Sequence, residues 1–249
     1  MEQKSNIVLI SDFGRSGQGW LSYMLCYILN AQFVEPYNFL NGKTYSASKD
    51  VISLTSGNLP GREKTKYNLV VKTHNYPSAE FNLTDKVIFL VRDPRDVAVS
   101  MHNLHLIQEK SVSWNHPRAK LFLTYYKIFS IGDYLRTIKD WAKHYKIWKN
   151  VIACQVRYED LLNDPKKTLV GILNYLEVQA NEKIIQEAIN EFSFEKITGR
   201  KRGEEDKKNP EFRKGISGDH KNKFSKFDMT VINSLFKSVI KKSGYEINR

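Results

Sequence analysis

Residues 6–29 read NIVLISDFGRSGQGWLSYMLCYIL and indicate a strand, a glycine-rich turn and a buried helix in immediate succession. The apolar run 7–10 has the length and β-branching of a buried strand. The turn that follows, residues 11–19, holds three glycines and Arg15. From Gln18 onward the chain is apolar on nearly every side of a helix, which predicts a helix inside the core. This order is typical of a phosphate-binding loop, whose backbone N–H groups converge on an anion at the start of a helix.

The same residues allow two other interpretations of the glycine-rich turn. The glycines would also suit an ordinary turn that only permits tight packing. A nucleotide triphosphatase or small-molecule kinase is the second alternative, because Gly14 and Gly19 have the spacing of its loop. That motif continues with Lys and Ser or Thr, which reach the terminal phosphates and hold Mg²⁺, whereas this chain continues with Trp20 and Leu21. We therefore expect a phosphate site without a metal, to which Arg15 supplies charge and a bidentate fork.

Length and cysteine content bound the class of protein. The 249 residues are enough for a full core in one large domain. No apolar run approaches the roughly 20 residues of a membrane span, and the first ten residues lack a signal-peptide pattern. The two cysteines, Cys26 and Cys154, lie in apolar segments. We expect free thiols in a cytoplasmic protein with no membrane partner.

Positive charge is concentrated late in the chain. The formal net charge is +12, and residues 196–226 carry eleven Lys or Arg against five Asp or Glu. Such a run is often solvated surface, but it would also serve an anionic ligand or a nucleic acid. A nucleic-acid-binding module would explain the charge but not the glycine loop, so we expect no nucleic-acid partner.

Apolar segments alternate with helical ones along the chain. Strands are expected at residues 7–10, 68–71, 87–91 and 151–156. Helices are expected to begin at four N-cap residues, which are Asp93, Asp164, Asn181 and Asp228. Residues 37–66 and 195–226 show no periodicity. The alternation predicts an α/β fold, a single domain over residues 1–249 with a central, mostly parallel sheet flanked by helices.

In such sheets, ligands bind beyond the carboxyl ends of the strands. Arg15, His74, Arg92 and Tyr158 each follow one of the expected strands. The functional site is therefore expected at that edge of the sheet.

Four segments together resemble the cytosolic-type sulfotransferases. They are FGRSGQGW (13–20), VVKTHNYP (70–77), VIFLVRDPRDVAVS (87–100) and FRKGISGDHKNKFS (212–225). The segments come in the family's order, each at its expected structural junction, and together they span most of the chain. The resemblance implies a P-loop nucleotide-binding-like sulfotransferase fold. It also implies an enzyme that moves the sulfonate of 3′-phosphoadenosine 5′-phosphosulfate (PAPS) to an acceptor hydroxyl or amine. The product would be 3′-phosphoadenosine 5′-phosphate (PAP), formed without a metal.

The resemblance implies two anion sites, because the donor carries a 5′-phosphosulfate and a 3′-phosphate. The 5′ end would be held by the loop residues Arg15, Ser16, Gly17, Gln18 and Gly19, with Trp20 against the adenine. The 3′-phosphate would be held by Arg92, Ser100, Arg213, Lys214 and the backbone of Gly215. Tyr158 and Phe194 match the family's adenine contacts.

Each assignment has an alternative from the residues alone. Arg92 would also serve as a cap or an ion-pair partner of Asp93 and Asp96. The Arg213–Lys214 pair would also fit plain surface charge, and the two aromatic residues would fit ordinary core packing.

His74 is the expected general base. A neutral imidazole is the usual side chain for taking a hydroxyl proton near pH 7, and His74 stands where the family places its base. Lys72 and Arg15 would neutralise charge on the sulfonate and on the departing phosphate oxygen. The expected reaction is an in-line displacement with no covalent enzyme intermediate.

The chain departs from the family pattern at four places. Arg15 stands where the family loop often has Lys. Gln18–Gly19 replaces the usual Thr-Thr, and Gly218–Asp219–His220 replaces the usual Gly-Asp-Trp. The family's dimer pattern is poorly kept from Lys221 onward, which leaves the oligomeric state open. The acceptor pocket is expected to involve residues 37–62 and 106–120. A small or ring-containing acceptor is favoured by a set of aromatic residues, Tyr37, Phe39, Tyr45, Phe81 and Trp114.

Overall fold

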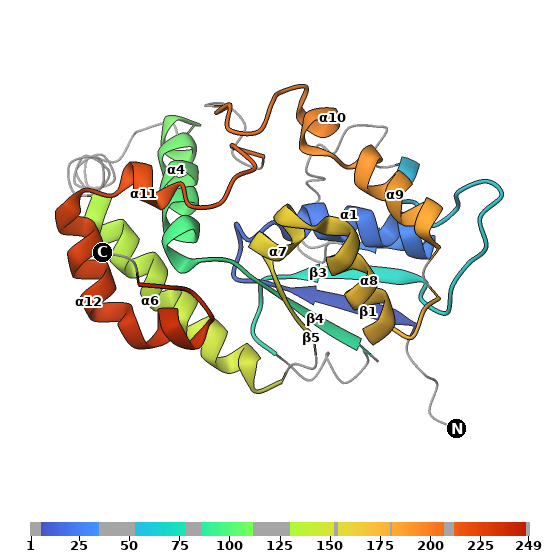
Figure 1. Cartoon of the computed structure of the whole chain (residues 1–249), viewed down its shortest axis with the longest axis horizontal. Coiled ribbons are helices and arrows are strands. Elements are labelled where there is room, and N and C mark those ends of the chain that lie inside the picture. The colour runs from blue at the N-terminus through green and yellow to red at the C-terminus, as the bar shows by residue number, and fades with distance from the viewer. Residues whose placement is uncertain are drawn as a thin grey trace. The chain divides into compact units, whose positions relative to one another are not determined.

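The chain, seen as a computed structural model, divides into two compact units (Figure 1). Unit 1 comprises Met1–Val91 and Ile147–Gly199, and unit 2 comprises Arg92–Lys146 and Arg200–Arg249. The structure describes residues 6–34, 53–77, 86–111, 130–151, 154–179, 181–206 and 212–247. The expectation of one domain over residues 1–249 stays a prediction.

Unit 1 is built on a five-stranded sheet in which every neighbouring pair is parallel. The strand order is β2-β3-β1-β4-β5, so β1 lies in the middle (Figure 1). The strands are β1 (Ile7–Ser11), β2 (Gln32–Val34), β3 (Leu69–Thr73), β4 (Lys86–Val91) and β5 (Cys154–Arg157). The predicted α/β class with a parallel sheet flanked by helices is confirmed. β2 was not expected, because three residues on a sheet edge are too few for a periodic signal.

Five helices lie wholly in the described part of unit 1. They are α1 (Gln18–Leu29), α7 (Tyr158–Asn163), α8 (Pro165–Tyr175), α9 (Glu182–Glu191) and α10 (Phe194–Thr198). α1 contacts β1, β3 and α9, while α7 and α8 contact β5. The predicted N-caps of α8 and α9 are confirmed, because Asp164 and Asn181 accept backbone N–H bonds from Lys167 and Ile184. The short helices α7 and α10 were not predicted.

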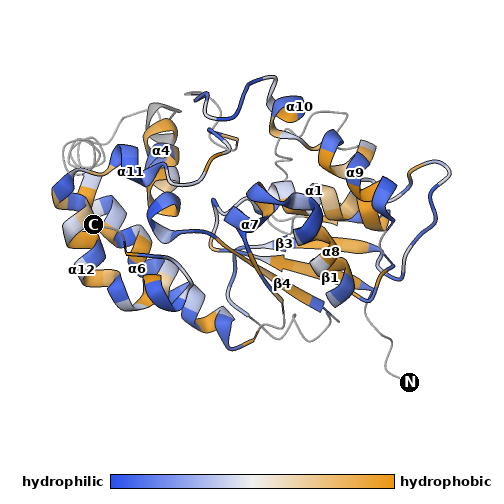
Figure 2. Ribbon diagram, viewed as in Figure 1, coloured by the Kyte–Doolittle hydropathy of each residue, from blue (hydrophilic) through white to orange (hydrophobic). Residues whose placement is uncertain are grey.

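The core of unit 1 is apolar on the strands and around α1. Leu21, Met24 and Leu25 of α1 are fully buried, as expected for a helix with no polar face. Both described cysteines are free thiols, as predicted. Figure 2 shows β1 and β4 as hydrophobic ribbons, whereas hydrophilic and hydrophobic residues share each of the outer helices.

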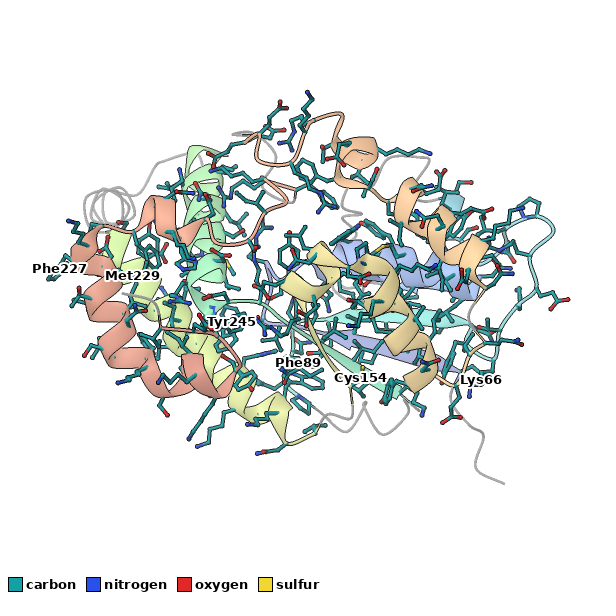
Figure 3. All side chains as sticks on the ribbon, viewed as in Figure 1. Lys66, Phe89, Cys154, Phe227, Met229 and Tyr245 are labelled. Carbon is teal, nitrogen blue, oxygen red and sulfur yellow. The ribbon has the colours of Figure 1, made fainter. Side chains whose placement is uncertain are left out.

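A tryptophan packs under the sheet and fixes the carboxyl end of β3. Trp148 stacks on Phe89 of β4, with ring centroids 6.1 Å apart and planes 19° apart. Its indole N–H donates to the carbonyl of Asn75, at 3.1 Å. Figure 3 labels Phe89 among the packed side chains of this unit. The segment that carries His74 is therefore tied to the core.

Unit 2 is helical in its described residues. It contains α4 (Pro94–Ser111), most of α6 (Ser130–Lys149), α11 (His220–Lys223) and α12 (Lys226–Lys242). Asp93 accepts a hydrogen bond from the backbone N–H of Arg95, at 2.9 Å, which fits its predicted role at the start of α4. The predicted cap of the last helix was wrong by one turn. Ser225 is the N-cap, and Asp228 is the third helical residue of a capping box.

None of the helices described here is long and apolar enough to cross a membrane.

Asp96 is the polar centre of unit 2. Its fully buried carboxylate accepts the backbone N–H groups of Gly218 (2.6 Å) and His220 (2.9 Å) and meets His220 Nδ1 at 2.7 Å. Burial opposes ionisation, but the hydrogen bond from His220 and the charge of Arg92 lower the pKa of Asp96 to about 2. One carboxylate on α4 thus holds the late loop that precedes α11.

We predict that Asp96→Ala destabilises the protein by about 3–5 kcal/mol, because it leaves the buried polar groups of Gly218 and His220 without their acceptor. The matched control is Asp140→Ala on α6, whose carboxylate is 55% exposed and 4.0 Å from Arg136. That change should cost less than about 1 kcal/mol. Urea unfolding of the three proteins measures both values, and equal losses would contradict the assigned role.

Urea unfolding at several pH values tests the direction in which the stabilisation by Asp96 changes with pH. The folded-state pKa of Asp96 is below its ordinary 3.8. Its stabilisation is therefore present above about pH 4 and is lost as the pH falls toward 2. The stability difference between the wild type and Asp96→Ala should shrink over that interval.

Candidate functional site

The loop between β1 and α1 turns by means of three left-handed residues. Gly14, Arg15 and Gly17 have φ angles of 103°, 61° and 89°. Glycine adopts such angles without penalty, whereas Arg15 holds a conformation that costs about 1–2 kcal/mol for a residue with a Cβ. Non-glycine residues in this region are concentrated at functional sites.

Gly17 is required by space as well as by φ. A Cβ at this position would lie 2.7 and 2.8 Å from two ring carbons of Tyr158. Tyr158 begins α7 at the carboxyl end of β5, so its ring closes on the loop. The loop and this aromatic residue therefore form one packed group within unit 1.

The start of α1 has neither a side-chain cap at its N-cap residue, Gly17, nor an acidic residue in its first turn. The first N–H groups of a helix have no partner inside it, and the helix dipole gives that end partial positive charge. These features are compatible with an anion at this helix start, and the anion site itself stays a prediction.

Two predicted loop residues have structural contacts that the sequence did not reveal. The side-chain amide of Gln18 donates to the carbonyls of Ile10 and, at 3.0 Å, of Thr73, and so joins the ends of β1 and β3. The hydroxyl of Ser16 donates to the Gly14 carbonyl, at 3.4 Å. The expected contacts of Ser16 and Gln18 with PAPS stay predictions. Because the side-chain amide of Gln18 is bonded to the two strands, its predicted contact with PAPS would be made by its backbone N–H.

His74 is paired with a buried acid. Its Nδ1 lies 2.6 Å from Oδ1 of Asp12, with the imidazole 39% exposed and the carboxylate 1% exposed. Ser11 and Thr73 are register partners in β1 and β3, so the next residue of each strand emerges beside the other. Sequence analysis missed Asp12. An acid that directly follows one strand, beside a histidine that follows its neighbour, was the available signal.

The environment of His74 raises its pKa. Burial favours the neutral imidazole, but the charge of Asp12 and its hydrogen bond outweigh that effect and raise the pKa above the ordinary 6.5. The charge of Lys72 acts in the opposite direction. Lys72 and His74 are two residues apart at the end of β3, and alternate residues of a strand share a face.

The predicted adenine contacts are buried aromatic residues of unit 1. Trp20 donates its indole N–H to the carbonyl of Phe192, at 2.7 Å, and meets Tyr158 edge to face with centroids 6.4 Å apart. Trp20, Tyr158 and Phe194 are each less than 10% exposed. Their core packing is thus observed, and their contact with adenine stays a prediction.

The cations predicted for the 3′-phosphate gather in unit 2 and are not plain surface charge. Arg213 is buried and pairs with Asp219 (2.6 Å) and Glu205 (2.8 Å), and Lys214 lies 3.0 Å from Asp219. Asp219 therefore holds both cations. Gly215, the next residue, has a φ of 63°.

Arg92 lies against the same late loop. Its guanidinium donates to the carbonyl of Ile216, at 2.9 Å, and lies 3.9 Å from Asp96. Asp93 pairs with Arg95, through two side-chain bonds of 3.0 and 2.7 Å. Ser100 is buried on α4, one turn beyond Asp96. The structure thus gathers Arg92, Arg213 and Lys214 around one segment of unit 2.

The structure does not describe the aromatic residues that were predicted to favour a ring-containing acceptor. Tyr37, Phe39, Tyr45, Phe81 and Trp114, expected to shape the acceptor pocket, lie outside the described residues. The described residues contain no group of three His, Cys, Asp or Glu side chains that could hold a metal ion.

The sequence matches the family model for the sulfotransferase domain over residues 5–244. Among curated relatives, rat "Sulfotransferase 1 family member D1" is 26% identical over 96% of this chain and 87% of its own length. Human "Sulfotransferase 1E1" is 27% identical over 94% of this chain and 85% of its own length.

Solved structures share the fold. Mouse sulfotransferase SULT7A1, solved in complex with PAP, has a TM-score of 0.61 at 21% identity, over 97% of this chain and 85% of that one. A retinol dehydratase solved with androsterone and PAP has a TM-score of 0.60 at 18% identity, over 99% of this chain and 84% of that one.

The chain belongs to the sulfotransferase domain family. The predicted resemblance is confirmed, and so is the expectation of a sulfotransferase enzyme.

We predict that Gly17→Ala destabilises the protein by about 2–4 kcal/mol, because the new Cβ meets both a left-handed φ and the Tyr158 ring. Gly19→Ala is the matched control, since its Cβ would approach only Tyr23, at an ordinary 4.0 Å. Inside a helix that change should be neutral or stabilising, by up to about 1 kcal/mol. Thermal or urea unfolding gives the ranking, and two equal effects would refute it.

Proposed function

We propose that this protein transfers the sulfonate of PAPS to a hydroxyl or amine of a small-molecule acceptor, with His74 as general base. One observation carries the proposal. Within unit 1 of a sulfotransferase-family chain, a histidine paired with a buried acid stands at the sheet edge from which α1, whose start has no side-chain cap, also emerges.

The proposed chemistry is a single displacement. The acceptor atom attacks sulfur, the bond from sulfur to the 5′-phosphate oxygen breaks, and PAP leaves with that electron pair. His74 takes the acceptor proton at Nε2, because Nδ1 faces Asp12. Arg15, Lys72 and the backbone N–H groups at the start of α1 would offset the negative charge that develops on the leaving oxygen.

The donor's 3′-phosphate would bind to the cations of unit 2. Arg213 and Lys214 are held by Asp219 and Glu205 in this structure. A phosphate would take part of their hydrogen bonds, as charge-assisted contacts with Arg and Lys are favourable for either anion. Arg92, Ser100 and the Gly215 backbone complete the proposed set.

We propose that no metal takes part, because Arg15, Lys72 and the N-terminus of α1 supply the positive charge that the transferring group needs. Full activity in the presence of a metal chelator is expected.

The proposed acceptor is a small, ring-containing molecule with a hydroxyl or amino group. The similar retinol dehydratase was solved with androsterone in one complex and with retinol in another. The two free thiols fit a reducing compartment, so we place the protein in the cytoplasm.

We predict that His74→Ala lowers turnover by about 10²–10⁴, the usual share of general base catalysis. Affinity for PAP should stay near that of the wild type, because His74 is not a donor ligand in this proposal. The loss should be largest for an alcohol acceptor and smaller for an acceptor already deprotonated near neutral pH.

The measurement compares both proteins on matched alcohol and acidic phenol acceptors, with isotopically labelled PAPS and a separate PAP titration. Near-normal turnover of the alcohol by His74→Ala would show that another group is the base.

A further inference from the structure

Asp12 is a buried carboxylate with two partners that belong to different parts of the proposed site. Oδ1 lies 2.6 Å from Nδ1 of His74, and Oδ2 accepts the backbone N–H of Ser16, at 3.2 Å. The backbone N–H of Asp12 donates to the carbonyl of Thr73, at 3.3 Å. Its position is thus fixed by both neighbouring strands and by the loop.

We infer that Asp12 is the positioning residue of the general base, and that it joins His74 to the anion-binding loop through a single carboxylate. This inference rests on the proposed function.

The first role concerns the tautomer of the imidazole. A neutral histidine carries one N–H, and the other nitrogen is an acceptor. A carboxylate that faces Nδ1 keeps the proton there, which leaves the lone pair on Nε2 to take the acceptor's proton. When Nε2 is protonated, the same carboxylate faces a positive imidazolium at a distance of one hydrogen bond. Asp12 thereby sets the ring's orientation and stabilises its charged form.

The second role concerns the loop. Ser16 lies between the left-handed residues Arg15 and Gly17, and its backbone N–H is committed to Asp12 instead of to a ligand. A carboxylate can face the Ser16 N–H with one oxygen and His74 Nδ1 with the other, while the backbone carbonyl of Asp12 also lies 3.4 Å from the same Nδ1. Asparagine has one oxygen and one NH₂ group, so it must lose one of the two contacts. The carbonyl can help to keep the proton on Nδ1, but only the carboxylate of Asp12 places a negative charge beside the imidazolium.

Asp12 and Lys72 have opposite effects on the charge of His74. Asp12 favours the imidazolium, and Lys72 disfavours it. The acid limb of the pH–turnover profile reports the pKa of the base. Because Asp12 raises that pKa, its removal should move the limb to lower pH.

A merely structural role for Asp12 in the turn makes a different prediction, and a double-mutant cycle separates the two. The four proteins are wild type, Asp12→Asn, His74→Ala and the double variant, assayed with labelled PAPS and one alcohol acceptor. We expect Asp12→Asn to lower turnover at least tenfold, with the acid limb at lower pH. In the His74→Ala background it should cause almost no further loss. Full additivity of the two losses would overturn the inference.

The tautomer can be read without any turnover. In ¹⁵N NMR of wild-type protein, neutral His74 should carry its proton on Nδ1, and in Asp12→Asn the pKa of His74 should fall. His105 is the internal control, because it is equally exposed and its Nδ1 faces Asp133 at 3.1 Å. This contact does not involve Asp12, so the ¹⁵N signals of His105 should be the same in both proteins.

The two experiments fail in distinguishable ways. A proton on Nε2 of wild-type His74 would overturn the assignment of Asp12, whether or not Asp12→Asn folds. Unimpaired turnover by His74→Ala, with the proton found on Nδ1, would instead refute the proposed general base on which the inference rests.

Discussion

The parallel register between β1 and β3 is the constraint on which the candidate site depends. Ile10 lies opposite Lys72, and Ser11 lies opposite Thr73. The residues that follow, Asp12 and His74, therefore leave the sheet side by side, and their side chains meet at 2.6 Å. Gln18 reaches back from α1 and bonds the last carbonyls of both strands. A shift of one residue in this register would point the alternate side chains to the other face, and it would separate the acid from the histidine. The local strain at Arg15 is sustained because the two strands and α1 hold both ends of the loop.

The cations of unit 2 that are proposed to bind the 3′-phosphate are held in place by acidic residues of the protein itself. Within the basic late segment, Arg213 and Lys214 are not freely solvated, since they are held by Asp219 and Glu205. Asp96, with its pKa lowered to about 2, fixes the backbone of the same loop through Gly218 and His220. The histidine that replaces the family's usual tryptophan thus has a partner of its own. Such a loop presents its cations in a set geometry, which reduces the ordering that binding an anion would otherwise require.

The sequence revealed the features that depend on local patterns, and it missed those that depend on pairing between segments. The apolar runs predicted four strands, and Asp164 and Asn181 were correctly read as caps because their contacts lie within a few residues. The Asp12–His74 pair joins residues 62 positions apart, and the tie of Asp96 to His220 spans 124 positions. Such partners do not show from the residues around either one, and the Asp12–His74 pair shows only when the ends of two strands are compared. The three residues of β2 were too short to show a period. Ser225 and Asp228 are both suitable N-cap residues, and both take part in the same capping box. The sequence alone did not show at which of the two the helix begins.

The most direct test of the account is a calorimetric titration of the protein with PAP and with AMP, in the absence of added metal. The two nucleotides share the adenosine and the 5′-phosphate, and PAP alone carries the 3′-phosphate assigned to Arg92, Arg213 and Lys214. PAP should bind at least tenfold more tightly, because each charge-assisted contact is worth about 1.5–3 kcal/mol. Lys214→Ala should reduce that advantage while leaving the affinity for AMP unchanged. Equal affinities for PAP and AMP in the wild-type protein would contradict the assignment of two anion sites.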